Sequence, residues 1–84
     1  MIKNEFILKI EESFNSKIIK KEALTEMVTL LSFNENKIIL KKVNTRTKNI
    51  YDFLASQKVG NVLYPIKQFV FEKEIFFVYK YIND

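Results

Sequence analysis

The chain contains no cysteine, no histidine and no tryptophan, and only one glycine and one proline among its 84 residues. Without cysteine it has no disulfides, thiol nucleophiles or cysteine-ligated metal sites. Without histidine it lacks the commonest general base and the commonest zinc ligand. No glycine-rich phosphate-binding motif is present either. We therefore expect a protein that is not an enzyme and that holds no cofactor and no metal.

Long apolar runs are also missing. No stretch approaches the ~18 apolar residues of a transmembrane helix. The first residues, M-I-K-N-E-F-I-L-K-I-E-E, alternate charged and apolar side chains and lack the continuous apolar region and small-residue cleavage site of a signal peptide. We expect a cytoplasmic protein with no membrane partner.

The composition is that of a folded domain, with 48% hydrophobic and 29% charged residues. A chain of this length is expected to form one domain, residues 1–84, that buries only ~60–65% of its unfolded surface. The net charge of +4 comes from lysines spread along the chain, which is more typical of solubility than of nucleic-acid binding.

The clearest element is a β-hairpin within Asn61–Ile82, where two apolar, β-branched and aromatic runs flank the polar triplet Glu72–Glu74. Alternation in its second strand places Ile75, Phe77, Tyr79 and Tyr81 on one face and Phe76, Val78 and Ile82 on the other. Because both faces are apolar, both need cover. The rest of the chain is expected to cover only one of them, which leaves the second for a protein partner or for self-association.

The remaining pattern predicts an α+β fold with a mostly antiparallel five-stranded sheet, a short N-terminal helix and a helix between the third and fourth strands. We expect a helix over Asn4–Phe14, strands over Lys17–Leu24, Glu26–Phe33 and Lys37–Val43, a helix from Thr45 to about Gln57, and the two strands of the hairpin. The first segment has an alternative, because Phe6, Leu8 and Ile10 also alternate as in a strand.

Local signals set the expected boundaries. Asn4 is the expected N-cap of the first helix, and Asn44–Thr47 offers capping side chains to the second. Gly60 suits a positive φ at the C-terminal cap of the second helix. Pro65 indicates an edge strand, a strand start or a bulge.

This order of elements resembles the N-terminal lobe of protein-kinase-like phosphotransferases, most closely the aminoglycoside-phosphotransferase and spore-coat kinase-like branch. Ile38–Lys41 is similar to the strand that ends in the phosphate-pairing lysine, and Thr45–Lys58 to the helix behind it. Val59–Ile66 is similar to the lead-in to the fourth strand, and Tyr79–Asp84 to the fifth strand entering the hinge. The resemblance alone implies that Lys41 is a nucleotide-binding residue.

The chain departs from that family in three respects. Lys21–Glu26 contains no glycine where the family has its phosphate loop, and no glutamate lies between Asn36 and Glu72 to pair with Lys41. The catalytic and metal-binding acids of the family belong to a second lobe that this sequence does not include. We expect no kinase activity from this chain alone.

Candidate site residues have a functional and a structural interpretation. By alternation Lys41 lies on a face with Ile39 and Val43, while Lys42 shares the face of Ile38 and Leu40. In the functional interpretation, a lysine at either position binds a phosphate or a carboxylate. In the structural interpretation, its methylene groups cover the sheet while its ammonium reaches water, and we favour this second interpretation. The neighbouring carboxylates Glu11 with Glu12 and Glu72 with Glu74 are interpreted as solvated surface groups.

Three functions follow as hypotheses. The first is a non-catalytic interaction or regulatory domain, similar to a stand-alone kinase N-lobe, that docks through an apolar aromatic sheet face or a sheet edge. Its partner-binding residues are expected to be Phe77, Tyr79, Tyr81, Tyr64 and Lys80. The second is a small RNA- or DNA-binding protein that uses Tyr64, Tyr79 and Tyr81 with Lys67 and Lys80 on the sheet. The third is an inhibitor or immunity-type protein of a mobile element.

Overall fold

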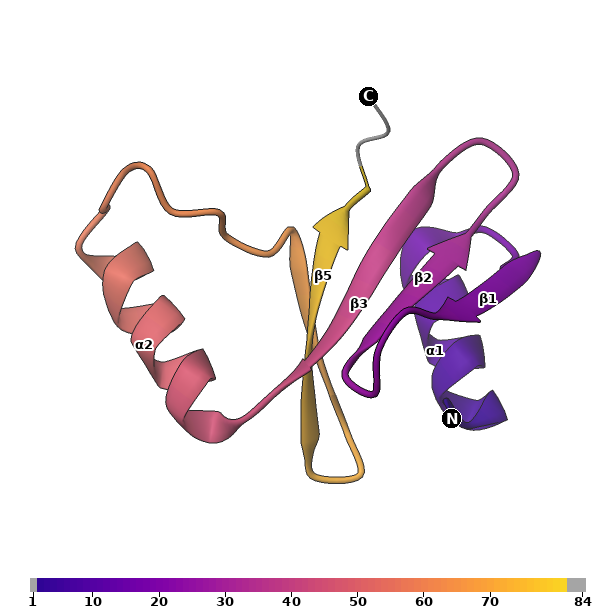
Figure 1. The fold of residues 1–84 in the computed structure, drawn as a ribbon, viewed down its shortest axis with the longest axis horizontal. Coiled ribbons are helices and arrows are strands. Elements are labelled where there is room, and N and C mark those ends of the chain that lie inside the picture. Colours follow the sequence, from indigo (N-terminus) through magenta and orange to yellow (C-terminus); the bar gives the residue numbers. More distant parts are fainter. Residues whose placement is uncertain (1, 82–84) are drawn as a thin grey trace.

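The computed structural model of the protein describes residues 2–81 and has an α+β fold (Figure 1). Its elements in chain order are α1 (Asn4–Phe14), β1 (Lys20–Ala23), β2 (Val28–Ser32), β3 (Lys37–Val43), α2 (Thr45–Ser56), β4 (Lys67–Phe71) and β5 (Glu74–Lys80). The strands form one antiparallel sheet in the order β1-β2-β3-β5-β4. Neither helix is long and apolar enough to cross a membrane. The predicted fold class is confirmed.

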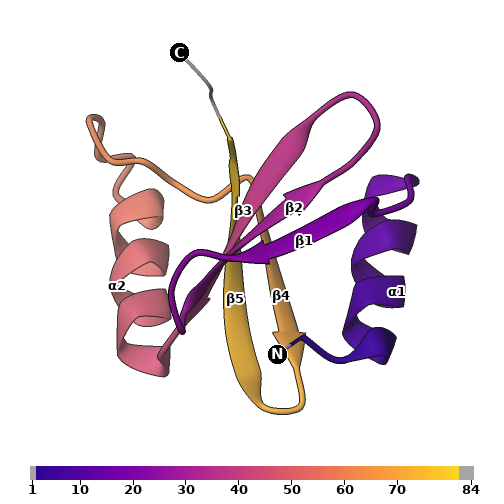
Figure 2. The same cartoon turned by 45° about the vertical axis from the view of Figure 1, so that its right-hand side comes forward.

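The two helices lie on opposite sides of the sheet (Figure 2). Strand pairing fixes which side chains face each helix, because Leu40 lies opposite Val78 and Ile39 lies opposite Tyr79 in the β3–β5 register. Leu40 and Val78 belong to the buried core with residues of α1, whereas Phe77, which alternates with Val78, meets Tyr51 of α2. The predicted division of β5 into two apolar faces is confirmed as far as Tyr81, and Ile82 lies outside the described residues.

The hydrophobic core lies between α1 and the sheet. It comprises Phe6, Ile10, Leu31, Phe33, Ile38, Leu40, Phe69 and Val78, all of which are buried. The Phe6 ring is stacked on Phe71 with centroids 4.9 Å apart, and it meets Phe76 at 4.6 Å and the edge of Phe69 at 5.8 Å. Such aromatic pairs contribute beyond their buried area, so α1 is a principal part of the core.

The bounds of α1 agree with the sequence, and the alternative strand does not form. The expected N-cap was wrong: Lys3 occupies the cap position without a side-chain hydrogen bond, and Asn4 is the first helical residue. The helix is instead anchored by Lys3, whose carbonyl accepts hydrogen bonds from the amides of Phe6 and Ile7. At the other end Asn15 adopts a left-handed conformation with φ 52°, which asparagine tolerates.

The first two strands are shorter than expected. Residues Lys17–Ile19 precede β1, because the Ile18 amide donates to Glu11 Oε2 at 2.8 Å and so turns the chain toward α1. In the link to β2, the Thr25 hydroxyl oxygen accepts from the amides of Met27 and Val28, both at 3.1 Å. The glycine-free link is thus a turn built by a threonine side chain.

The ends of α2 confirm one expectation and correct another. The Asn44 side chain caps the helix by accepting from the Thr47 amide at 2.8 Å. Gly60 is not the C-terminal cap and has no positive φ; Lys58 takes the left-handed conformation, with φ 54°. α2 ends at Ser56 and its C-cap is Gln57. The left-handed residue that commonly follows such a cap is therefore Lys58, which lies two positions before Gly60.

The C-terminal hairpin turns at Glu72 and Lys73, with φ of 49° and 68°, while Glu74 already belongs to β5. Two consecutive left-handed residues define the type I′ turn that suits a two-residue hairpin loop. β4 begins at Lys67, so Pro65 lies two residues before the strand and not early within it as expected, although β4 is an edge strand as the proline indicated.

Candidate interaction surfaces

α2 contacts the sheet through the ring of Tyr51. This ring meets Phe77 of β5 edge-to-face with centroids 5.3 Å apart, and Tyr64 of the following loop at 6.3 Å. The Tyr64 hydroxyl donates to the Val59 carbonyl at 2.7 Å, which ties that loop to the end of α2. Phe77 is fully buried as a result.

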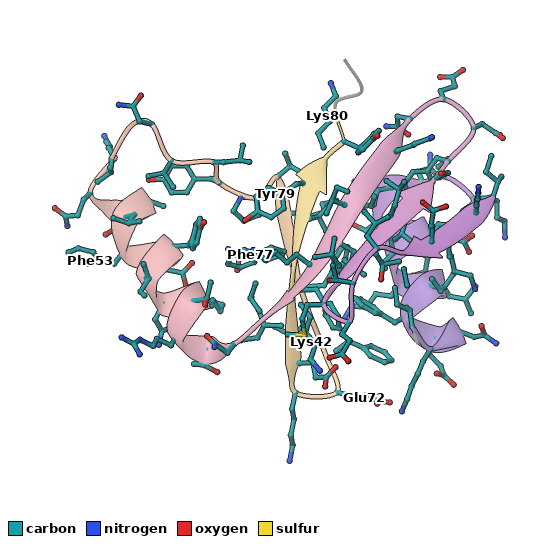
Figure 3. All side chains as sticks on the ribbon, viewed as in Figure 1. Lys42, Phe53, Glu72, Phe77, Tyr79 and Lys80 are labelled. Carbon is teal, nitrogen blue, oxygen red and sulfur yellow. The ribbon has the colours of Figure 1, made fainter. Side chains whose placement is uncertain are left out.

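Tyr79 completes this aromatic cluster beside Phe77, with ring centroids 6.4 Å apart. Burial, together with the nearby Tyr51 and its hydrogen bond, raises the pKa of the Tyr79 hydroxyl to about 12. Figure 3 shows Phe77 and Tyr79 pointing from β5 toward α2. The Tyr79 hydroxyl therefore ionises at a higher pH than a free phenol.

The opposite side of α2 leaves apolar residues in solvent. None of its residues is buried, and Ile50 and Phe53 are 48% and 63% exposed. Phe53 points away from the sheet (Figure 3). Helical spacing in the sequence predicts one apolar face of α2 made of Ile50, Phe53, Leu54 and Gln57, but of these only Leu54 is half-buried, so this face as a whole does not pack on the sheet. Helical periodicity gives the reason, since Tyr51 and Leu54 lie toward the sheet while Ile50 and Phe53 lie further round the helix.

We define the α2-side surface as the exposed side of α2, the loop that follows it and the part of the sheet face beside it. Its exposed apolar residues are Ile50, Phe53, Val59 and Leu63, the last of which is 76% exposed. On the same face of the sheet Leu30, Ile39 and Ile75 are only half-buried. α2 and its loop thus cover this face incompletely.

Ion pairs neutralise both acids of the α2-side surface. Lys48 contacts Asp52 one helical turn along α2, at 2.5 Å, and this contact lowers the pKa of Asp52 below its ordinary value. Glu22 of β1, which is opposite Leu30 and so on this face, lies 3.8 Å from Lys20. The lysines and arginine that form no ion pair therefore set the charge of the surface.

A groove of about 770 Å³ opens on the other face, between the start of α1 and the ends of the hairpins. Apolar side chains of Phe6, Leu40, Phe71 and Phe76 line it, and charged residues surround its mouth. Two ion pairs, each 2.6 Å long, link opposite charges there: Lys3 with Glu72 and Lys42 with Glu74. Glu72 raises the pKa of Lys3 through the hydrogen bond and its charge. The groove has the volume of a small-molecule pocket, and two of its lining lysines are paired with glutamates, whereas Lys21 and Glu26 form no ion pair within residues 2–81.

The structure places the two candidate lysines differently. Lys42 is half-buried on the groove side with Leu40, as alternation predicted, and its ammonium forms an ion pair with Glu74. Lys41 is exposed on the α2 side, opposite Phe77 in the sheet register, and forms no ion pair with any residue from 2 to 81. The described residues also contain no group of three or more acids that could hold a metal ion.

The predicted partner-binding residues are divided between the faces. Phe77 is buried, Tyr79 is half-buried beside it, and Tyr64 is half-buried in the loop after α2. Tyr81 is half-buried, with the Lys37 ammonium 5.8 Å from its ring centroid. Lys80 is exposed and lies opposite Ile38, a core residue of the α1 face.

Lys67 also belongs to the α1 face, where its ammonium contacts the Ser13 hydroxyl at 2.6 Å and lies 4.8 Å from the Phe14 ring. The tyrosines and these two lysines therefore do not share one sheet face. The sequence analysis did not predict that Phe53 points away from the sheet. The available signal was the helical spacing of Tyr51 and Leu54, which places these two residues on one face of α2.

Comparison of the chain with protein-family models, curated proteins and solved structures found no match. The resemblance to a kinase N-lobe stays a prediction from the sequence, and the function has to be argued from the surfaces described above.

Proposed function

We propose that the protein is a non-catalytic interaction domain that binds a protein partner through the α2-side surface. The observation that carries the proposal is the poor burial of α2, which has no buried residue and presents Phe53 to solvent. A helix of a small domain normally owes its stability to an apolar face packed on the core. Here part of the apolar surface of α2 and its loop is left for another molecule.

The sheet face beneath α2 supports the same proposal. Ile39 and Ile75 are apolar and half-exposed, so a partner that packs on α2 can also remove them from water. Each square ångström of apolar surface so buried stabilises the complex by roughly 25 cal/mol before the costs of association. Apolar surface that is contiguous and incompletely covered is typical of interaction sites.

The free edge of β1 is the second place where a partner could dock, by strand addition. All four residues of β1 are exposed, but the strand is short and carries Lys20 and Lys21. Short, lysine-bearing edges are the usual means by which proteins prevent such pairing. The α2-side surface is therefore the better candidate.

The test is a selection of binders from a display library of random peptides, with the pure protein as the target. We expect selected peptides to lose affinity roughly tenfold or more for Phe53→Asp, because the charge removes the central apolar contact. The matched control is Leu8→Asp, which changes an apolar residue that is 56% exposed on the other helix. Peptides that bind Phe53→Asp as well as the unchanged protein, or that depend on Leu8 instead, would contradict the proposal.

A further inference from the structure

We infer that the partner of the α2-side surface is an acidic protein segment that also carries apolar side chains; this inference rests on the proposed function. It starts from the distribution of charge along the chain. Residues 37–71 contain seven lysines and arginines and a single acid, Asp52, which gives this segment a net charge of +6 in a chain whose total is +4. The segment includes β3, α2 and β4.

The fold concentrates part of this charge on one side. Lys42 and Lys67 face α1, where they contact Glu74 and Ser13. Lys37 and Lys41 alternate onto the other face of β3, and Arg46 and Lys58 lie at the two ends of α2. None of these last four forms an ion pair within residues 2–81.

No acid of the described chain remains to balance them. Both acids of the α2-side surface, Asp52 and Glu22, already have lysine partners. The other described acids belong to α1, line the groove or, in Glu35, lie beside Ser16 near the end of α1. The α2-side surface therefore combines exposed apolar side chains with uncompensated positive charge, and a complementary partner is acidic and apolar.

The same charges argue against a second copy of the chain as the occupant. Two copies that met through this surface would bring Lys41, Arg46 and Lys58 of each toward those of the other, and like charges at an interface oppose association. Self-association of the isolated protein should accordingly be weak.

Nucleic acid is an acidic partner too, but the apolar part of the surface fits it poorly. Of its exposed apolar residues, Ile50, Val59 and Leu63 are aliphatic and Phe53 alone offers a ring, whereas single-stranded nucleic acids stack successive bases on several exposed aromatic rings. The rings beneath α2 already contact one another, and Phe77 is fully buried. A protein segment uses both features of the surface.

The experiment measures binding of two synthetic amphipathic peptides that share their leucines and differ in having glutamate or glutamine at the polar positions. We expect the glutamate peptide to bind roughly tenfold or more tightly, and to weaken between about 50 and 200 mM salt. The triple variant Lys41→Glu, Arg46→Glu, Lys58→Glu should abolish this preference. The control Lys9→Glu, Lys17→Glu, Lys73→Glu changes the net charge equally at exposed sites elsewhere and should retain it.

The outcomes separate the inference from the proposed function. Equal binding of both peptides, lost in Phe53→Asp, would overturn the acidic partner and leave the interaction domain standing. Poly-glutamate or single-stranded oligouridine binding as tightly as the glutamate peptide would also overturn the inference, because apolar side chains would then be unnecessary. If neither peptide bound and the library yielded no Phe53-dependent binder, the proposed function itself would fail.

Discussion

The ring of Tyr51 meets the buried ring of Phe77 edge-to-face at 5.3 Å, and this contact joins α2 to the sheet. On the opposite face α1 contributes Phe6 and Ile10 to the core, both of which are buried. The two helices therefore differ in how they are held: α1 by a cluster of buried side chains, and α2 by half-buried tyrosines. We expect α2 to be the less stable of the two helices.

The first prediction concerns this contact. Tyr51→Ala should lower the free energy of unfolding by about 1–2 kcal/mol, since it removes a half-buried ring and uncovers Phe77. The control Phe53→Ala should change it by less than about 0.5 kcal/mol, because that ring points into solvent. Urea unfolding gives both values, and amide hydrogen exchange should show faster exchange in α2 of the Tyr51 variant. An equal loss in the Phe53 variant would mean that the outer ring is packed.

The second prediction concerns the core beneath α1. Phe6→Ala should cost about 3–5 kcal/mol, because the ring is buried among Phe69, Phe71 and Phe76. A domain of this size has little stability to spare, so this variant is expected to be largely unfolded, and Phe6→Leu provides a folded intermediate case. Leu8→Ala, on the exposed side of the same helix, is the control and should be nearly neutral. Calorimetry measures all three, and a folded Phe6→Ala variant with unchanged melting temperature would contradict the structure.

The third prediction concerns catalysis. We expect no phosphoryl transfer by this chain, because Lys41 is exposed and has no acidic partner within residues 2–81, and the chain has no glycine-rich phosphate loop. The measurement is ATP turnover by the pure protein beside Lys41→Ala and, as a control, Lys42→Ala. Sustained turnover that disappears only in the Lys41 variant would restore the kinase interpretation.

Much of the fold was predictable because its signals are local. Alternation in β3 and β5 determines which residues share a face, and the side chain of Asn44 marks the start of α2. Both patterns depend on residues that are close in sequence, so they survive into the structure unchanged.

The incorrect predictions concern features that depend on tertiary contacts. The apolar residues of α2 permit either Ile50 with Phe53 or Tyr51 with Leu54 to face the sheet, and only the position of Phe77 decides between them. Gly60 was predicted to be the C-terminal cap of α2 because it is the chain's one glycine, yet Lys58 is the residue that adopts a positive φ there. The groove was not predictable, since it joins the start of α1 to two hairpin ends that are distant in sequence.

The fourth prediction uses the hairpin turn, where Glu72 and Lys73 both have positive φ without being glycine. A left-handed conformation costs a residue with a side chain about 1–2 kcal/mol. Lys73→Gly should therefore stabilise the protein by up to about 1 kcal/mol, the remainder being offset by the greater freedom of glycine in the unfolded chain. Lys67→Gly, at the start of β4, is the control and should be destabilising. Thermal unfolding distinguishes them, and a loss of stability in Lys73→Gly would show that the turn has another conformation.

The fifth prediction follows from Tyr79, whose pKa burial and Tyr51 raise from 10.0 to about 12. The folded state then holds the phenolic proton more tightly than the unfolded state, so this contribution to stability is complete below pH 10 and is lost as the pH rises to about 12. Absorbance titration at alkaline pH should show a phenol that ionises late, and Tyr79→Phe should remove that phase. The same variant should also reduce the alkaline decline in stability, measured by urea unfolding at successive pH values. Tyr81→Phe is the matched control from the same face of the sheet and should leave the late phase intact. If the late phase persisted without Tyr79, the late ionisation would belong to another tyrosine, and the raised pKa assigned to the Tyr79 hydroxyl would be wrong.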